Sequence, residues 1–174
     1  MPEVTDQTQS TEPSSEPTVL TPDGFGKDVN DYLNHYVTVA DAKAAAILAS
    51  NFIVLGALTT IDTKTCILSI GFFITGITSL ISILYCITSL YPRLSHAGKG
   101  LIFWESIRKH NSQEDYLKEL AKLDGKAKEV EYGKQNWHVS SVLSTKNNHV
   151  RNSLWAFGIS VLLLSAVYII SKFL

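Results

Sequence analysis

Three long stretches without a charged or histidine side chain constrain this chain more than any other feature. They contain 18, 27 and 20 residues: Ala44–Ile61, Thr65–Tyr91 and Asn152–Ser171. An α-helix rises about 1.5 Å per residue, so each stretch can cross a hydrocarbon core roughly 30 Å thick. The sequence therefore predicts an all-α integral membrane protein with three transmembrane helices. Buried helices of a soluble protein are the alternative, because the first stretch is the shortest and contains Ser50 and Asn51.

The first two stretches are separated by a short polar turn, Asp62–Lys64, so spans at about 44–61 and 66–90 form an antiparallel hairpin. Small residues recur four apart within the second span and predict a helix-packing face: Gly71, Thr75 and Ser79. The other hydroxyls of this span that we consider, on Thr78, Ser82, Thr88 and Ser89, are expected to bond back to carbonyls of their own helix. A hydroxyl-lined water path is the alternative.

The helix of the first span begins before the membrane. Apolar side chains recur every three or four residues from Asp28, a candidate N-cap, to Ala40. Residues 28–91 thus form a cytoplasmic helix leading into the hairpin, and a third span covers residues 153–171. Residues 1–27 are rich in Thr, Ser, Pro and Glu, so we expect a disordered cytoplasmic tail and no cleavable signal peptide.

Lysine and arginine residues are distributed unequally around the spans. Two precede the first span, one lies in the hairpin turn, eleven lie between the second and third spans, and one follows the third. Positive charge accumulates on the cytoplasmic side of membrane proteins. We therefore expect the N-terminus and the segment between the second and third spans in the cytoplasm, and the C-terminus on the external side of the membrane.

Residues 92–152 are expected to form a small helical cytoplasmic module between the second and third spans. A short helix is predicted around "GLIFWESIRKH", and a second helix starts at Ser112, where Asp115 makes an imperfect capping box. A third helix follows Asp124–Gly125. If Gly133 and the polar "STKNNH" do not interrupt it, this helix runs straight into the last span.

No arrangement of residues in the sequence supports catalysis or metal binding. None of the five histidines has the spacing of a helical zinc hydrolase, and no phosphate-cradling glycine-rich loop or nucleophile elbow occurs. Cys66 and Cys86 both fall inside the second span, where a thiol is usually an apolar packing residue. We therefore expect a non-enzyme without a cofactor or a metal ion.

An acidic and a basic residue, Asp41 and Lys43, lie where the first helix enters the membrane. Two residues apart on a helix, they point in different directions and do not neutralise each other. One interpretation is an ordinary anchor, in which Lys43 reaches the lipid headgroups and Asp41 stays in water. The other is a latch, in which Asp41 bonds a basic side chain of the cytoplasmic helices and Lys43 bonds a phosphate.

At these positions the chain resembles the transmembrane effectors of the Pycsar anti-phage systems, which have an aspartate, a lysine and a run of small residues at the entrance to the first span. The matching residues here are Asp41, Lys43, Ala44 and Asn51. The resemblance covers roughly Tyr32–Ile170, including the hairpin, the aromatic "LIFW", the "EDYLKEL" helix and a polar stretch before the third span. The order of these elements is more specific than any single motif.

The resemblance implies a function. A partner pyrimidine nucleotide cyclase that senses infection would make cyclic UMP or cyclic CMP, and this messenger would activate the effector to impair the inner membrane and cause abortive infection. Three spans are too few to enclose a pore, so we expect a homo-oligomer in the lipid bilayer, driven by a ligand that binds the assembled state better. No nucleic acid polymer is expected as a partner.

A cyclic mononucleotide carries one negative charge and a flat base, so its site needs cations or backbone amides and often an aromatic ring. Eight residues are candidates for ligand binding or coupling: Asp41, Lys43, Trp104, Arg108, Lys109, Tyr132, Lys134 and Trp137. The alternative is that the two tryptophans form an interfacial belt and the basic side chains a solvated face that attracts lipid.

Two other functions fit the same architecture. A purine or oligonucleotide messenger would keep the membrane effector and change its ligand, which a nucleotide panel would detect. A constitutive scaffold would recruit a protein partner without binding nucleotide or opening the membrane. Substitution of Asp41 or Lys43 by alanine in such a scaffold would change recruitment and leave permeability unaltered.

Overall fold

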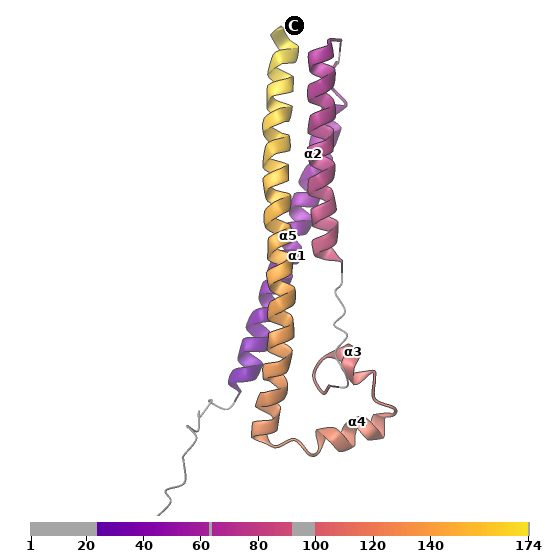
Figure 1. Ribbon diagram of the computed structural model, residues 1–174, viewed down its shortest axis with the longest axis vertical. Helices are drawn as coiled ribbons and strands as arrows, with labels where there is room; N and C mark the ends of the chain where they lie inside the picture. The colour runs from indigo at the N-terminus through magenta and orange to yellow at the C-terminus, as the bar shows by residue number, and fades with distance from the viewer. Residues whose placement is uncertain (1–23, 63, 92–99, 174) are drawn as a thin grey trace, which may run out of the picture.

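The computed structural model describes residues 24–62, 64–91 and 100–173, and these ranges contain five helices and no strand (Figure 1). The helices are α1 (Phe25–Leu58), α2 (Cys66–Leu90), α3 (Trp104–Ile107), α4 (Gln113–Leu120) and α5 (Gly125–Phe173). Since α1, α2 and α5 are each long and apolar enough to cross a membrane, the predicted all-α fold with three such helices is confirmed. The predicted tail up to residue 23 and the start of the predicted module, 92–99, lie outside the described residues.

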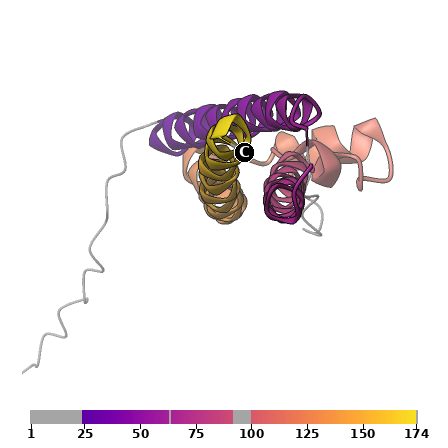
Figure 2. The same cartoon turned by 90° about the horizontal axis from the view of Figure 1, so that it is seen from above.

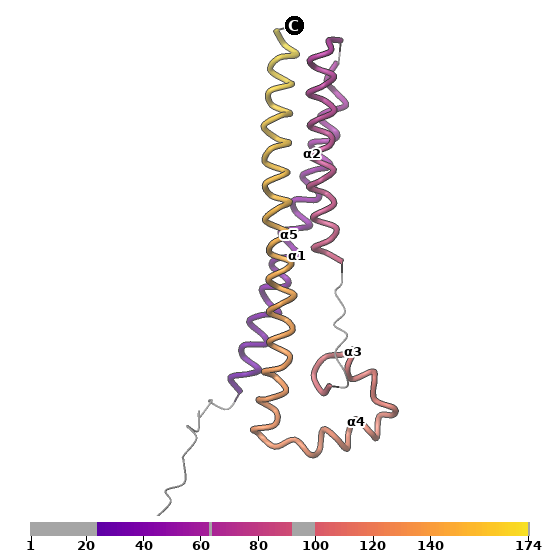
Figure 3. The backbone as a smooth tube through the Cα atoms, in the orientation of Figure 1, coloured from indigo at the N-terminus to yellow at the C-terminus, as the bar shows by residue number. Residues whose placement is uncertain are grey.

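The three long helices all pack against one another. The tube in Figure 3 shows α1 and α5 running in the same direction, with α2 antiparallel to both. Seen from above, α2 and α5 are nearly end-on while α1 runs obliquely across them (Figure 2). Small residues allow the helix backbones to approach closely, and Ala40, Ala44 and Val150 form the buried apolar cluster at the contact of α1 with α5.

The first part of α1 and the first part of α5 extend past the end of α2 and lie side by side (Figure 1). We call this two-helix part, residues 25–40 with residues 125–145, the stem. α5 is one helix of 49 residues, about 73 Å long at 1.5 Å per residue. The prediction that the last module helix continues unbroken into the third span is therefore confirmed. Because α5 belongs to both parts, a displacement of its first half in the stem can be transmitted to its second half in the apolar bundle.

α1 begins three residues before the position predicted from periodicity, and Asp28 lies in its first turn instead of capping it. The residue before the helix is Gly24, whose φ of 92° favours glycine. The cap comes from α5, because the Glu129 carboxylate accepts from the backbone N–H of Gly24 at 3.1 Å and of Gly26 at 2.8 Å. The Asp28 prediction was wrong because this carboxylate lies 103 residues from Gly26 along the chain.

We expect Glu129→Ala to loosen the start of α1, because two backbone N–H groups lose their acceptor. Loss of a side-chain cap costs about 1 kcal/mol, and bonds to a charged group are at the upper end of this range. Hydrogen exchange of the full chain in detergent should show faster exchange at the first turn of α1. Glu131→Ala is the control, since Glu131 pairs with exposed Lys134 on the same helix; equal protection in the two variants would refute the capping role.

The face of α2 that packs against its neighbours is the one predicted from the spacing of Gly71, Thr75 and Ser79. Thr75 and Ser79 are fully buried, and a Cβ added to Gly71 would lie 2.5 Å from Cγ2 of Val167 on α5. Cys86 is buried as expected, whereas Cys66 is exposed because it is the first residue of the helix.

The four hydroxyl groups expected to bond back, on Thr78, Ser82, Thr88 and Ser89, divide into two pairs. Thr78 and Thr88 donate to carbonyls of their own helix, as predicted, and Thr75 of the packing face does the same. Ser82 and Ser89 do not, because each lies against α5 and donates to one of its backbone carbonyls, at 2.9 and 3.5 Å. For these two residues the prediction was wrong, and their hydroxyls hold two helices together.

The segment with α3 and α4 folds on itself beside the stem (Figure 1). The short helix predicted here is confined to the four residues of α3, whereas α4 starts after Ser112 as predicted, with the Ser112 hydroxyl accepting from the Asp115 N–H at 3.1 Å. The preceding loop is fixed by its neighbours, because His110 Nε2 lies 3.2 Å from the Gly100 carbonyl and the Tyr116 hydroxyl donates to Leu101. These contacts hold the residues before α3 against α4 and the loop that precedes it.

Candidate functional site

Lys146 of α5 connects all three long helices where the stem meets the apolar bundle. Its ammonium donates to Asp41 on α1 and, at 2.9 Å, to the backbone carbonyl of Ser89 in the last turn of α2. Carbonyls in the last turn of a helix carry partial negative charge, so this oxygen favours a cation. The Lys146 side chain is only 6% exposed, whereas Asp41 is 37% exposed and reaches the surface. We call these three residues the Lys146 cluster.

A second polar connection crosses the bundle deeper in the apolar part. Asn51 of α1 is fully buried, and its amide donates at 2.9 Å to the Ser82 hydroxyl of α2, which in turn donates at 2.9 Å to the Ser153 carbonyl of α5. Asn51 thus takes part in a connection between three helices, which neither its polar character in the first span nor its match to the family pattern predicted. Interhelical hydrogen bonds of this kind are common in membrane bundles and contribute roughly 0.6 kcal/mol each.

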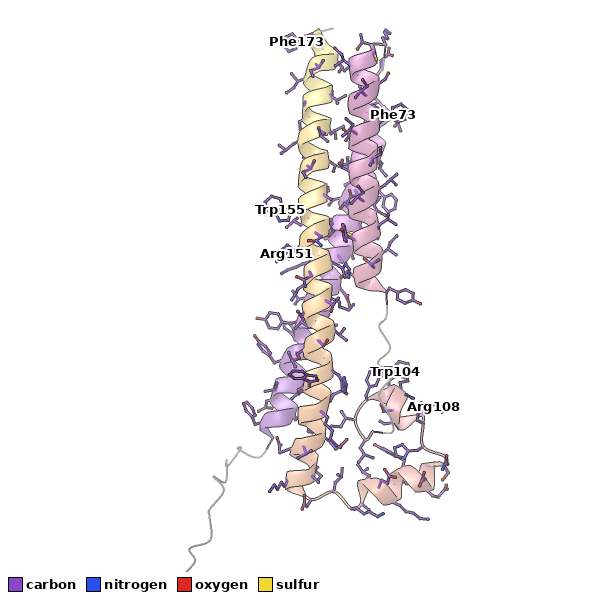
Figure 4. The ribbon with its side chains drawn as sticks, in the orientation of Figure 1. Phe73, Trp104, Arg108, Arg151, Trp155 and Phe173 are labelled. Atoms are coloured by element: carbon purple, nitrogen blue, oxygen red, sulfur yellow. The ribbon has the colours of Figure 1, made fainter. Side chains whose placement is uncertain are left out.

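A cavity of about 400 Å³ lies between the stem and the segment that begins α3. Four polar side chains from α1 and α5 line it: Asn30, Asn34, Gln135 and His138. Phe103 and Trp104 add an aromatic wall, with their ring centroids 5.6 Å apart. Trp104 is 60% exposed and lies on the segment beside the stem (Figure 4), so the cavity is open to solvent. We call it the stem cavity.

The asparagines of the stem form a continuous chain of hydrogen bonds. Asn34 donates to Asn30 at 2.9 Å, Asn30 donates to Asn136 at 3.0 Å, and Asn136 donates to the Gly26 carbonyl at 2.9 Å. These bonds hold α1 against α5 on the cavity wall. Within the described part of the chain, the side chains of Gln135 and His138 make no hydrogen bond, so their polar atoms remain available to a ligand.

The predicted aromatic and basic candidates do not gather at one place. All eight candidates lie within the residues that the structure describes, and of these eight only Trp104 lines the stem cavity. Arg108 lines a separate recess beside α4, and Lys134 lines another at the start of α5, where it pairs with Glu131 at 2.6 Å. Trp137 is 76% exposed on the stem surface. Two more candidates lie outside the cavity: Lys109, exposed after α3, and Tyr132, beside Gly26.

Asp41 and Lys43 have different environments. Asp41 bonds a basic side chain of α5, so this part of the latch interpretation is confirmed. Lys43 is exposed and makes no hydrogen bond or ion pair with any residue that the structure describes, so its bond to a phosphate stays a prediction. Lys146 could not be recognised from the sequence as part of this site, because it lies in the polar "STKNNH" and has the pattern of a solvated lysine.

The described residues contain no group of three His, Cys, Asp or Glu side chains that could hold a metal ion. Most of the chain, residues 26–171, matches the Pycsar effector protein domain. The chain belongs to this family. Over 156 residues it is 30% identical to the Pycsar effector protein SaPycTM of Staphylococcus aureus. The aligned region covers 84% of this chain and 95% of that relative. No solved structure matches the chain.

Family membership confirms the resemblance seen over roughly Tyr32–Ile170, and the family match extends it slightly, to residues 26–171. The chain is therefore a membrane effector of anti-phage defence. Membership in the Pycsar family also implies a cyclic nucleotide signal and a partner cyclase. The open stem cavity and the two connections across the bundle are the features through which such a signal could act.

Proposed function

We propose that this Pycsar effector is activated by a cyclic pyrimidine nucleotide, cyclic UMP or cyclic CMP, and then impairs the integrity of the cell membrane, which causes abortive infection. The observation that carries the proposal is the continuity of α5, which runs from the stem into the apolar bundle without a break. A nucleotide that changes the packing of the stem would therefore change the packing of the membrane helices. The effector acts without catalysis, by a shift between two helix arrangements.

The proposed orientation follows from the positive charges. Eleven of the 15 lysine and arginine residues lie between the second and third charge-free stretches. We place this segment, the stem and the N-terminus in the cytoplasm of the bacterial cell, and the C-terminus on the external face. The stem cavity then opens toward the compartment in which a cyclase makes its product.

Membrane damage requires several copies of the chain, because three helices packed in one bundle leave no room for a central pore. Large apolar side chains point away from the bundle and are available to lipid or to another copy, as Phe73 and Trp155 show in Figure 4. The messenger drives assembly only if it binds the assembled state better than the resting state. A change from 1% to 99% assembled requires a preference of roughly 10⁴-fold.

The proposal is tested by expressing the chain together with an active uridylate or cytidylate cyclase and following membrane potential with a voltage-sensitive dye. We expect rapid depolarisation with at least one cyclase and none with the same cyclase inactivated by substitution. Intact membrane potential in cells that contain both the effector and measured cyclic UMP or cyclic CMP would contradict the proposal. Recruitment of a protein partner without depolarisation would favour the scaffold alternative.

A further inference from the structure

We propose that the stem cavity is the messenger site and binds one cyclic pyrimidine mononucleotide. The base lies against Trp104, the carboxamides of Asn34 and Gln135 bond its polar edge, and the phosphate lies near His138. This inference rests on the proposed function and adds the place and the chemistry of ligand binding. It also moves the ligand contacts away from most of the basic residues that the sequence suggested.

The size of the cavity fits a single nucleotide. Ligand sites in proteins are usually about 300–1,000 Å³, and this cavity, at about 400 Å³, lies near the lower limit. A single mononucleotide is of a suitable size for such a space. The cavity is also open at the Trp104 side, so a ligand can enter without separation of α1 from α5.

The charge of the lining also favours a mononucleotide. None of the described residues that line the cavity is Asp, Glu, Lys or Arg. A ligand with several phosphates needs several cations to offset the loss of its hydration, whereas a cyclic mononucleotide carries one charge and can keep its phosphate near solvent. Among those described lining residues, His138 is the side chain that can carry a positive charge, and it is exposed at the cavity edge.

The two carboxamides match the edge of a pyrimidine. A carboxamide has both a donor and an acceptor, so it can pair with the imide of uracil or with the amine and ring nitrogen of cytosine. Gln135 makes no hydrogen bond within the described residues, and Asn34 uses its amide donor on Asn30 while its oxygen remains available. The indole of Trp104 provides a flat apolar face, on which stacking is favourable for any base.

The cavity is adjacent to the Lys146 cluster. Val37 and Val142 line it, and each lies four residues, about one helical turn, before Asp41 and Lys146 respectively. A nucleotide that touches both α1 and α5 therefore favours one distance between these two helices, about one helical turn before the ion pair that joins them. The site thus lies where binding can alter the arrangement of the membrane helices.

The test measures binding of cyclic UMP, cyclic CMP, cyclic AMP and cyclic GMP to the full chain in detergent by isothermal titration. We expect one of the pyrimidine nucleotides to bind best, and Gln135→Ala and Trp104→Ala to weaken its binding at least tenfold. Trp137→Ala is the matched control, because Trp137 lies on the same helix two residues from Gln135 but on another face, is 76% exposed and does not line the cavity. This variant should bind within twofold of the wild-type chain.

Melting curves without nucleotide show whether each variant is folded. If Trp104→Ala does not fold, Gln135→Ala and His138→Ala still test the site, because both side chains make no hydrogen bond within the described residues. Binding by these variants that equals the wild type overturns the proposed site, as does tighter binding of a purine nucleotide than of both pyrimidines.

Co-expression with the cyclase separates failure of the site from failure of the proposed function. Variants that still depolarise cells like the wild-type chain show that the site is elsewhere while the function holds. A wild-type chain that neither binds a cyclic pyrimidine nucleotide nor depolarises cells overturns both. Loss of depolarisation together with loss of binding, with Trp137→Ala active in both measurements, supports the site.

Discussion

Asp41→Ala is expected to lower the melting temperature of the detergent-solubilised chain by about 6–12 °C. The substitution leaves the Lys146 ammonium, 6% exposed, with the Ser89 carbonyl and without its carboxylate partner. Removing one member of a buried ion pair costs roughly 3–5 kcal/mol. Because Asp41 is itself 37% exposed, we expect the free energy of unfolding to fall by about 3 kcal/mol, the lower end of this range. In a chain of this size each kcal/mol lowers the melting temperature by about 2–4 °C.

Lys146→Met should be much less harmful, because the carboxylate that remains can reach water while the apolar side chain fills a buried position. Combining Asp41→Ala with Lys146→Met should therefore recover most of the stability lost in Asp41→Ala alone. Such a double-mutant cycle measures the interaction directly. Equal destabilisation by the two single substitutions, without recovery in the double variant, would show that the ion pair does not have this asymmetric environment.

Lys43→Ala is the natural control for the same region of α1. Lys43 lies two residues from Asp41 and is exposed, without a hydrogen bond or ion pair to any described residue. Charged side chains at the surface contribute about 0–1 kcal/mol to the free energy of unfolding. A change in melting temperature below 2 °C in Lys43→Ala would therefore separate the Lys146 cluster from a general effect of charge at the start of the bundle.

The membrane helices could be recognised from the sequence because the cost of burying charge in lipid is large and local. The stretch Thr65–Tyr91 lacks charged residues and nearly coincides with α2, and Ser112 caps α4 where the capping signal predicts it. Both signals depend on residues close together in the chain. The start of α1 does not, because its cap is the carboxylate of Glu129 on another helix.

The candidate site was less predictable for the same reason. Lys146 and Asp41 are 105 residues apart, and their pairing depends on the parallel arrangement of α1 and α5. The described residues that line the stem cavity are uncharged polar and apolar side chains and His138, whereas the basic candidates were predicted because a phosphate attracts cations. Of the predicted residues only Trp104 lines it, because Trp137 and Lys134 face other directions on a helix whose orientation the sequence does not give.

The two connections across the bundle give α1, α2 and α5 a defined resting arrangement. Ser82 and Ser89 of α2 both donate to carbonyls of α5, and the second lies at the Lys146 cluster. In lipid the hydrophobic effect does not drive helices together, so polar bonds and close packing decide their positions. A helix arrangement held by a few such contacts can be shifted by the binding energy of one small ligand, which makes the packing of α2 against α5 a sensitive point.

Gly71→Leu is expected to disrupt that packing at the end of the bundle away from the stem. A Cβ at this position would lie 2.5 Å from Cγ2 of Val167, so either the Val167 side chain or the two helices must shift. Overpacking of this kind costs about 1–3 kcal/mol, which corresponds to a lower melting temperature in detergent. Gly76→Leu on the same helix is the matched control, because a Cβ there meets nothing within 4 Å and the gain in helix propensity is the same.

The difference between these two leucine variants isolates the contact with Val167. We expect Gly76→Leu to melt at or above the wild-type temperature and Gly71→Leu several degrees below it. Adding Val167→Ala to Gly71→Leu should restore part of the loss, because the smaller side chain makes room for the new one. If the two leucine variants melt at the same temperature, α2 does not approach α5 at Gly71 in the membrane protein.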